Sequence, residues 1–265
     1  MIYNLGRHKI IWLITALLAL AVSLAGVLAP QVYSQVVSHE MLPGTISQDM
    51  VAAAASLLLL LLLVGLKERH AARQIVILGL LGFYFYAYGI YAIERVYNLL
   101  YFAYLAIFGL AFWGLVYGLA SLRRDVLEKV SLPNLLRRVS VGFSLLMPLI
   151  FYPLWIGRLL PLLRTGTKIE FLYSVFIIDL CFIMPAFIIV AVKSARREGL
   201  GLVLTPAMYV LSFSILFPLS LGEVMKPLLY DLPLDPGGFW LFLVLSLAFL
   251  VLSVACLMKL EFELE

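Results

Sequence analysis

Residues 83–104 read FYFYAYGIYAIERVYNLLYFAY. Two apolar runs flank the charged pair Glu94 and Arg95, and this pattern predicts two helices joined by a short turn. Helices with so short a link run antiparallel and lie side by side. Tyrosines recur in each helix at positions i, i+4 and i+7, which places them on one face: Tyr84, Tyr88 and Tyr91, then Tyr97, Tyr101 and Tyr104. We expect these two tyrosine stripes to face one another.

The stripes have two interpretations. Tyrosine is enriched at membrane interfaces, where the ring lies among the headgroups and the hydroxyl reaches water. Alternatively, the hydroxyls line the wall of a polar site. Tyr84 and Tyr104 lie about ten residues from the turn, hence ~15 Å along a helix, which is deeper than an interfacial belt requires.

The composition places the whole chain in a bilayer. Of 265 residues, 64% are hydrophobic and 13% are charged, whereas soluble domains are about half apolar and about a quarter charged. Segmentation into apolar runs of about 20 residues predicts one integral membrane domain, residues 1–265, with eight spans: 10–29, 50–66, 74–93, 98–120, 139–163, 171–192, 200–221 and 239–258. The fold class is therefore an all-α, polytopic transmembrane helix bundle.

The basic residues predict the orientation of the bundle. With a cytoplasmic N-terminus, five of the 19 basic residues fall outside, as the positive-inside pattern requires: Arg95, Arg158, Arg164, Lys168 and Lys226. Both termini are then cytoplasmic, in the cytoplasmic (plasma) membrane. Attraction of the inner loops to anionic lipids accounts for the net charge of +4 without a nucleic-acid partner. Residues 121–138 could form an amphipathic surface helix, either as a lipid anchor or as a docking element.

Asp179 is the most informative polar residue, because a carboxyl group within the hydrocarbon is costly and therefore marks function by default. It lies about eight residues into its span, ~12 Å deep, and must face the bundle interior. Pro185 follows in the same span and frees a backbone carbonyl. The alternative is a structural role, in which the carboxyl group only joins neighbouring helices.

Other polar residues share the outer half of the bundle with Asp179. Arg158 ends the fifth span, next to Trp155, which we interpret as an interfacial anchor, while Glu94, Arg95 and Asn98 cap the tyrosine hairpin. This one-sided distribution predicts an outward-facing pocket formed by the third to sixth helices. The candidate ligand-binding residues are Asp179, Tyr84, Tyr88, Tyr91, Asn98, Tyr101, Tyr104, Glu94, Arg95 and Arg158.

Several chemistries lack a sequence basis. The three histidines, His8, His39 and His70, lie in predicted termini or loops, so a haem or a histidine-rich metal site within the membrane is not expected. Motifs of zinc proteases, serine hydrolases and P-loop enzymes are absent from the sequence. We therefore expect no cofactor, no metal and no assigned catalytic residue.

The tract LLGFYFYAYGIYAIERVYNLLYFAY and the later FLYSVFIIDLCFIMPAF resemble a widespread group of prokaryotic multi-pass membrane proteins of uncharacterised function. The resemblance covers residues 78–221, and one departure is the pair Glu94 and Arg95, where a glycine-rich aromatic turn is expected. The resemblance implies no activity, but it implies that the matching residues form one group. These residues are Tyr86, Tyr88, Asn98, Tyr104, Asp179, Leu180 and Pro185.

The leading functional hypothesis is binding of a small or lipid-like ligand in the outer pocket, for transport or sensing, with membrane lipids around the bundle. The first alternative is an enzyme that modifies lipids within the membrane, with Asp179 as acid or base. The second is a structural or assembly subunit that packs on a membrane-protein partner or on further copies of itself.

Overall fold

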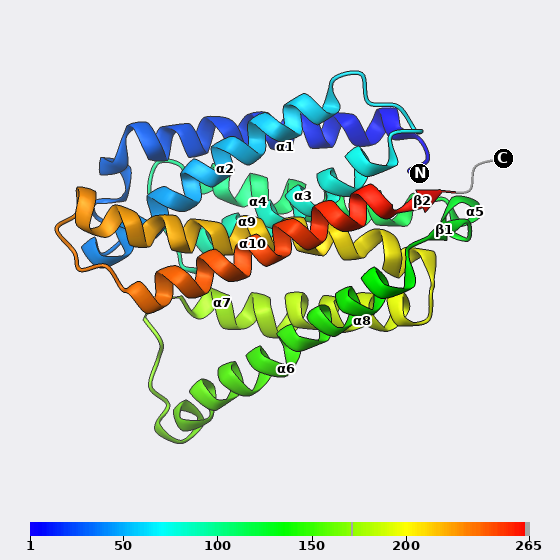
Figure 1. The fold of residues 1–265 in the computed structure, drawn as a ribbon. Coiled ribbons are helices and arrows are strands. Elements are labelled where there is room, and N and C mark those ends of the chain that lie inside the picture. The colour runs from blue at the N-terminus through cyan, green and yellow to red at the C-terminus, as the bar shows by residue number, and fades with distance from the viewer. Residues whose placement is uncertain (171, 263–265) are drawn as a thin grey trace.

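A computed structural model describes residues 1–170 and 172–262 of the chain (Figure 1). In this part, eight helical segments are long and apolar enough to cross a membrane, as expected from the sequence, and the protein is an all-α, multi-pass membrane protein. Seven spans are single helices: α1 (Leu5–Leu28), α2 (Leu42–Leu63), α3 (Ala71–Ile93), α4 (Tyr101–Ala120), α6 (Asn134–Thr165), α9 (Gly199–Leu229) and α10 (Pro236–Lys259).

The sixth span is built from three pieces. Helix α7 (Tyr173–Ile178) leads into a π-helical segment, η3 (Asp179–Ile183), and then into α8 (Met184–Ala195). Phe171, the first residue of the predicted sixth span, lies outside the described residues. Short elements complete the chain: the 3-10 helices η1 (Pro30–Tyr33) and η2 (His39–Met41), the helix α5 (Arg124–Leu127), and the strands β1 (Val130–Ser131) and β2 (Glu261–Phe262).

Helix α3 is the centre of the bundle. In its most apolar window 83% of the residues are buried, compared with 22% to 56% in the other spans, as expected for a helix that is hydrophobic on all sides. It packs against α4 on one face and α9 on another. Gly79 allows the close approach of α9, because a Cβ there would lie 2.6 Å from the Ala207 carbonyl oxygen. Small residues commonly serve this purpose between transmembrane helices.

Helix α6 is the least integrated span. It contains Pro148, Pro153 and Pro161, packs mainly against α8, and leans away from α10 towards its C-terminal end (Figure 1). Proline removes a helical hydrogen bond and bends the helix. Much of the surface of α6 is correspondingly exposed, with 22% of its apolar window buried.

At one end of the bundle, the N-terminal residues are held by hydrogen bonds to the loop before α3 and to α3 itself. The Met1 amino group donates to the Glu68 carbonyl at 2.8 Å, and the Ile2 N–H donates to Oε1 of Gln74 at 2.8 Å. Strands β1 and β2 pair antiparallel at the same end, as Figure 1 shows.

The prediction of an amphipathic surface helix over residues 121–138 is wrong. Only one helical turn, α5, forms there, because the segment pairs with β2 and because α6 begins earlier than predicted, at Asn134. Arg137, which the sequence placed in this loop, is a buried residue of α6. Its guanidinium donates to the carbonyls of Ser194 and Ala195 at 3.3 and 3.0 Å. Both carbonyls belong to the last turn of α8, where helical N–H donors run out; the Ser194 carbonyl also accepts the Arg197 N–H at 3.0 Å.

Candidate functional site

Asp179 begins the π-helical segment of the sixth span. Pro185 has no N–H to donate to the preceding turn, and the π-helical segment ends two residues before it, at Ile183. The hydroxyl of Tyr152 donates to the Leu180 carbonyl at 3.4 Å, so a side chain from α6 satisfies a backbone group within the widened turn. Single π-helical turns inside α-helices occur often at functional sites.

The Asp179 carboxyl group is buried and accepts hydrogen bonds from aromatic side chains. Nε1 of Trp155, on α6, donates to its Oδ2 at 2.8 Å, and the Tyr86 hydroxyl of α3 is its second side-chain partner. Trp155, which we interpret from the sequence as an interfacial anchor, thus also has a partner inside the bundle. No basic side chain among residues 1–170 and 172–262 forms an ion pair with this carboxyl group.

Arg158 contacts the indole ring of Trp155, which in turn donates to the Asp179 carboxyl group. Its guanidinium carbon lies 5.5 Å from the centre of the Trp155 ring, a distance typical of a cation–π contact. The Arg158 side chain is exposed. It can hold the orientation of Trp155 but does not neutralise Asp179 directly.

Asp179 lies in the wall of a cavity of about 400 Å³. Its lining is mostly apolar, with Phe151 and Trp155 from α6, Phe242 and Phe249 from α10, and contributions from α2, α3, α9 and the sixth span. A few polar groups interrupt this surface: Thr45, Gln48, Tyr86, Tyr91, Asp179 and Ser212. A cavity of this size and mixed lining is typical of ligand sites.

The cavity differs from the predicted pocket in the helices that form it. The third, fifth and sixth spans take part as expected, but the fourth, α4, contributes no lining residue and α2, α9 and α10 do. Helix α4 packs instead against α1 and α3. The prediction of a wall made by α4 is therefore wrong.

Three of the six stripe tyrosines, Tyr84, Tyr88 and Tyr104, are buried away from the cavity. The Tyr84 hydroxyl pairs with Oγ of Ser56 at 2.9 Å, and the Tyr88 hydroxyl donates to the Ala19 carbonyl at 3.2 Å. Both partners belong to other helices, α2 and α1. Tyr91 alone of the six predicted stripe residues lines the cavity.

The second stripe meets the first only at Tyr104. The Tyr104 ring lies 4.8 Å from that of Tyr91 and 6.1 Å from that of Tyr88. Tyr101 donates to the Ala92 carbonyl at 3.2 Å, and Tyr97 is 63% exposed. The two stripes diverge because α4 begins at Tyr101, so Tyr97 belongs to the turn and not to a helix.

The residues of the hairpin turn hold loops together. Oε1 of Glu94 accepts the Ser174 N–H at 2.7 Å, which fixes the start of α7. Asn98 accepts the Leu100 N–H at 2.9 Å, and it donates to the Tyr104 hydroxyl at 3.0 Å. Arg95 is exposed and adopts a left-handed conformation with φ of 57°. None of these three polar residues lines the cavity.

A second buried carboxyl group, Asp49, was not predicted from the sequence. The predicted second span began at Met50 and left Asp49 in the preceding loop, whereas α2 begins at Leu42 and Asp49 is 1% exposed. Its Oδ2 accepts the Tyr33 hydroxyl at 2.6 Å, and its Oδ1 accepts the Tyr91 hydroxyl at 3.2 Å. Pro43 could have indicated the early start, since proline favours the first turn of a helix.

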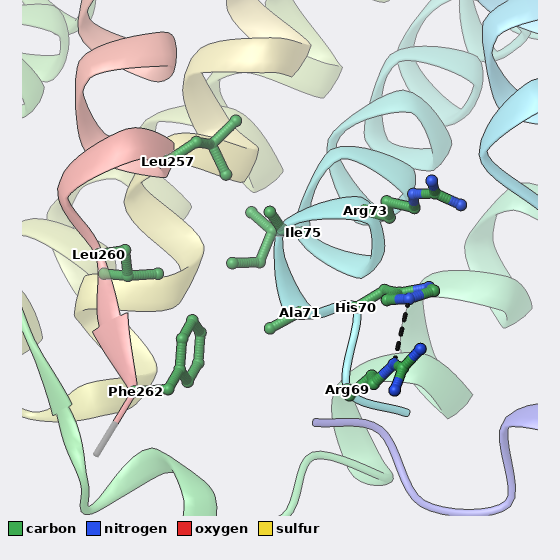
Figure 2. A pocket seen from close by; sticks show the side chains of 9 residues that line it. Arg69, His70, Ala71, Arg73, Ile75, Leu257, Leu260 and Phe262 are labelled. Carbon is green, nitrogen blue, oxygen red and sulfur yellow. Dashed lines mark hydrogen bonds between the residues drawn. The ribbon is translucent and has the colours of Figure 1, made fainter. Parts of the chain in front are cut away.

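Another cavity, of about 350 Å³, lies at the opposite end of the bundle, between the start of α3 and the end of α10 (Figure 2). Leu257, Leu260 and Phe262 form an apolar wall, while the side chains of Arg69 and His70 extend away from that wall (Figure 2). Partial desolvation and the cationic neighbours lower the pKa of His70. In this second cavity the basic side chains point away from the apolar wall, so the two do not line a common binding surface. The Asp179 cavity is therefore the better candidate for a ligand site.

Comparison of the chain with protein-family models, curated proteins and solved structures finds no match. Within the described residues, no group of three or more His, Cys, Asp or Glu side chains is arranged to hold a metal ion. The chemistry of the site therefore has to be argued from Asp179 and its surroundings.

Proposed function

We propose that the protein binds an amphiphilic ligand, with an apolar body and a cationic or hydrogen-bond-donating head, in the Asp179 cavity. The single observation that carries this proposal is a buried carboxyl group without a cationic partner in the wall of a mostly apolar cavity. A buried charge is stable only when it is paired or neutralised. A cationic or donor head would pair with the carboxylate, and the aromatic walls would bury the apolar body.

The position of the cavity supports a ligand drawn from the membrane. Residues of α6 and α10 both line it, yet these two helices hardly pack against one another, and α6 leans outward in Figure 1. An amphiphile would therefore enter from the hydrocarbon between α6 and α10. The basic residues concentrate at the end with the N-terminus, which supports a cytoplasmic membrane location with the cavity in the outer half. Transport or sensing of the ligand is the role that we infer.

The test is labelling of the purified protein in lipid nanodiscs with photoreactive long-chain probes that differ only in their heads: trimethylammonium, hydroxyl and carboxylate. We expect the trimethylammonium probe to label cavity residues most strongly. Loss of a charged hydrogen-bonding partner costs about 1.5–3 kcal/mol, so Asp179→Asn should weaken labelling by this probe about ten- to a hundredfold.

Asp231→Asn is the matched control, because Asp231 is an exposed carboxylate at the same end of the bundle. It should leave labelling unchanged. Equal labelling of wild type and Asp179→Asn by all three probes, or labels confined to residues outside the cavity, would refute the proposal.

A further inference from the structure

The second carboxyl group, Asp49, lies in a buried polar cluster that the proposed ligand site does not use. Four elements surround it, and the titratable groups that they present to it are all phenols: Tyr33 of η1, Tyr88 and Tyr91 of α3, and Tyr104 of α4. Helix α1 presents Gly26. No ion pair to Asp49 occurs within residues 1–170 and 172–262.

The packing around Asp49 leaves no space for a counter-ion against α1. A Cβ atom on Gly26 would lie 1.8 Å from Oδ2 of Asp49 and 2.8 Å from the Tyr33 hydroxyl oxygen, so the carboxyl group fills the space next to the glycine backbone. A buried carboxylate without a cation is strongly disfavoured. A proton is the one neutralising species that requires no added volume.

Tyr91 connects this carboxyl group to the ligand cavity. Its hydroxyl has two acceptors within reach, Oδ1 of Asp49 at 3.2 Å and the Thr45 carbonyl oxygen at 3.4 Å. Both Tyr91 and Thr45 line the cavity. A hydroxyl has one proton to donate, so it can serve only one of these acceptors fully at a time.

We propose that Asp49 is a proton-binding site and that its protonation turns the Tyr91 hydroxyl from Asp49 to the Thr45 carbonyl. When Asp49 is ionised, Oδ1 accepts from Tyr91. When Oδ1 takes up one proton, supplied by hydronium from the aqueous phase, it becomes a donor to the Tyr91 oxygen, and the Tyr91 hydroxyl keeps its own proton but rotates to donate to the Thr45 carbonyl oxygen. No bond between heavy atoms changes, and the net event is the uptake of one proton.

This arrangement would couple proton binding at Asp49 to ligand binding in the cavity. The coupling rests on the proposed function, whereas the proton site is argued independently of any ligand. A ligand that prefers one orientation of the Tyr91 hydroxyl would change the proton affinity of Asp49, and by linkage the proton would change the ligand affinity by the same factor. Binding driven by a proton gradient is one activity that such a site would support.

Infrared spectroscopy of the full chain in nanodiscs, without any ligand, tests the proton site. Spectra recorded from about pH 5 to about pH 9 should contain a carboxylic-acid C=O stretch that titrates and that Asp49→Asn removes. Tyr91→Phe should shift this band, because it removes the partner of the protonated oxygen. Tyr84→Phe is the matched control, since Tyr84 is a buried tyrosine of the same helix whose hydroxyl pairs with Ser56, and it should leave the band unchanged.

The outcomes separate this proposal from the ligand proposal, because the measurement uses no ligand. A spectrum that is identical in wild type and Asp49→Asn at every pH overturns the proton site, and a band that Tyr91→Phe does not move overturns the switch. If Asp49→Asn does not fold, the response of the band to Tyr91→Phe and to Tyr33→Phe, which both retain the carboxyl group, decides the assignment. Asp179→Asn should leave the Asp49 band in place.

Discussion

Substitution of Gly26 by alanine would disturb the Asp49 cluster without removing any of its polar groups. The added methyl group would lie 1.8 Å from Oδ2 of Asp49, where real Cβ atoms do not approach other atoms, and 2.8 Å from the Tyr33 hydroxyl oxygen. Either the carboxyl group moves and loses the 2.6 Å hydrogen bond from Tyr33, or α1 moves away from α2. Overpacking costs about 1–3 kcal/mol, and a lost hydrogen bond to a buried charged group costs about 1.5–3 kcal/mol. By either route the free energy of unfolding should fall by about 1–3 kcal/mol.

Thermal unfolding in nanodiscs, followed by circular dichroism, measures this effect. Gly109→Ala in α4 is the matched control, because no atom lies within 4 Å of its added Cβ, and alanine is favoured over glycine inside a helix by about 0.5–1 kcal/mol. It should equal or exceed the wild type in stability. A Gly26→Ala protein as stable as Gly109→Ala would show that Asp49 does not occupy the space beside Gly26, and the packing argument for proton binding would fail.

Three further predictions concern packing and the charged end of the bundle. Gly79→Ala should destabilise the protein by about 1–3 kcal/mol in the same unfolding assay, because the clash is with the backbone of α9; unchanged stability would contradict the close approach of α3 and α9. Arg137→Ala should lower the free energy of unfolding by about 1–3 kcal/mol, since the Ala195 carbonyl loses its side-chain donor and the Ser194 carbonyl loses one of its donors, whereas Arg138→Ala, at an exposed neighbour, should have little effect. Hydrogen bonds from Arg123 lower the pKa of Asp125, so this pair stabilises the fold above the ordinary aspartate pKa and loses that contribution as pH falls through the lowered value. Asp125→Asn should flatten the acid side of the stability curve, and an unchanged acid side would exclude the pair.

The eight spans could be predicted from the sequence because the bilayer requires long apolar runs, and the chain supplies one for each helix. The burial of Asp179 was predictable for the same reason, since its position within the run left it no route to water. The partners of Asp179 were not predictable. Trp155 is 24 positions away, and its approach depends on the packing of α6 against the sixth span.

The burial of Asp49 was not predicted because spans were identified as apolar runs, and the run of the second span begins after Asp49, at Met50. The residues LPGTISQD that open α2 read as a loop, yet two of their polar side chains, Ser47 and Asp49, are fully buried. Ser47, for example, donates to the Pro218 carbonyl of α9 at 2.7 Å. Polar groups that are satisfied by neighbouring helices leave no mark in a hydropathy pattern, and only the tertiary contacts reveal them.

The widened turn at Asp179–Ile183 has a mechanical consequence. A π-helical turn holds an extra residue, so migration of that turn by one position would rotate the residue that it passes by about 100°, one step of an α-helix. Pro185 obstructs migration towards α8 because it lacks an N–H, but α7 offers no such obstacle. The π-helical turn of the sixth span could therefore migrate towards α7 but not towards α8. Such a shift would rotate Asp179 relative to Trp155 while both ends of the span stay fixed. Distances from a spin label on Cys181, an exposed residue of the same turn, to a label on α6 that remain single-valued under all conditions would exclude this motion.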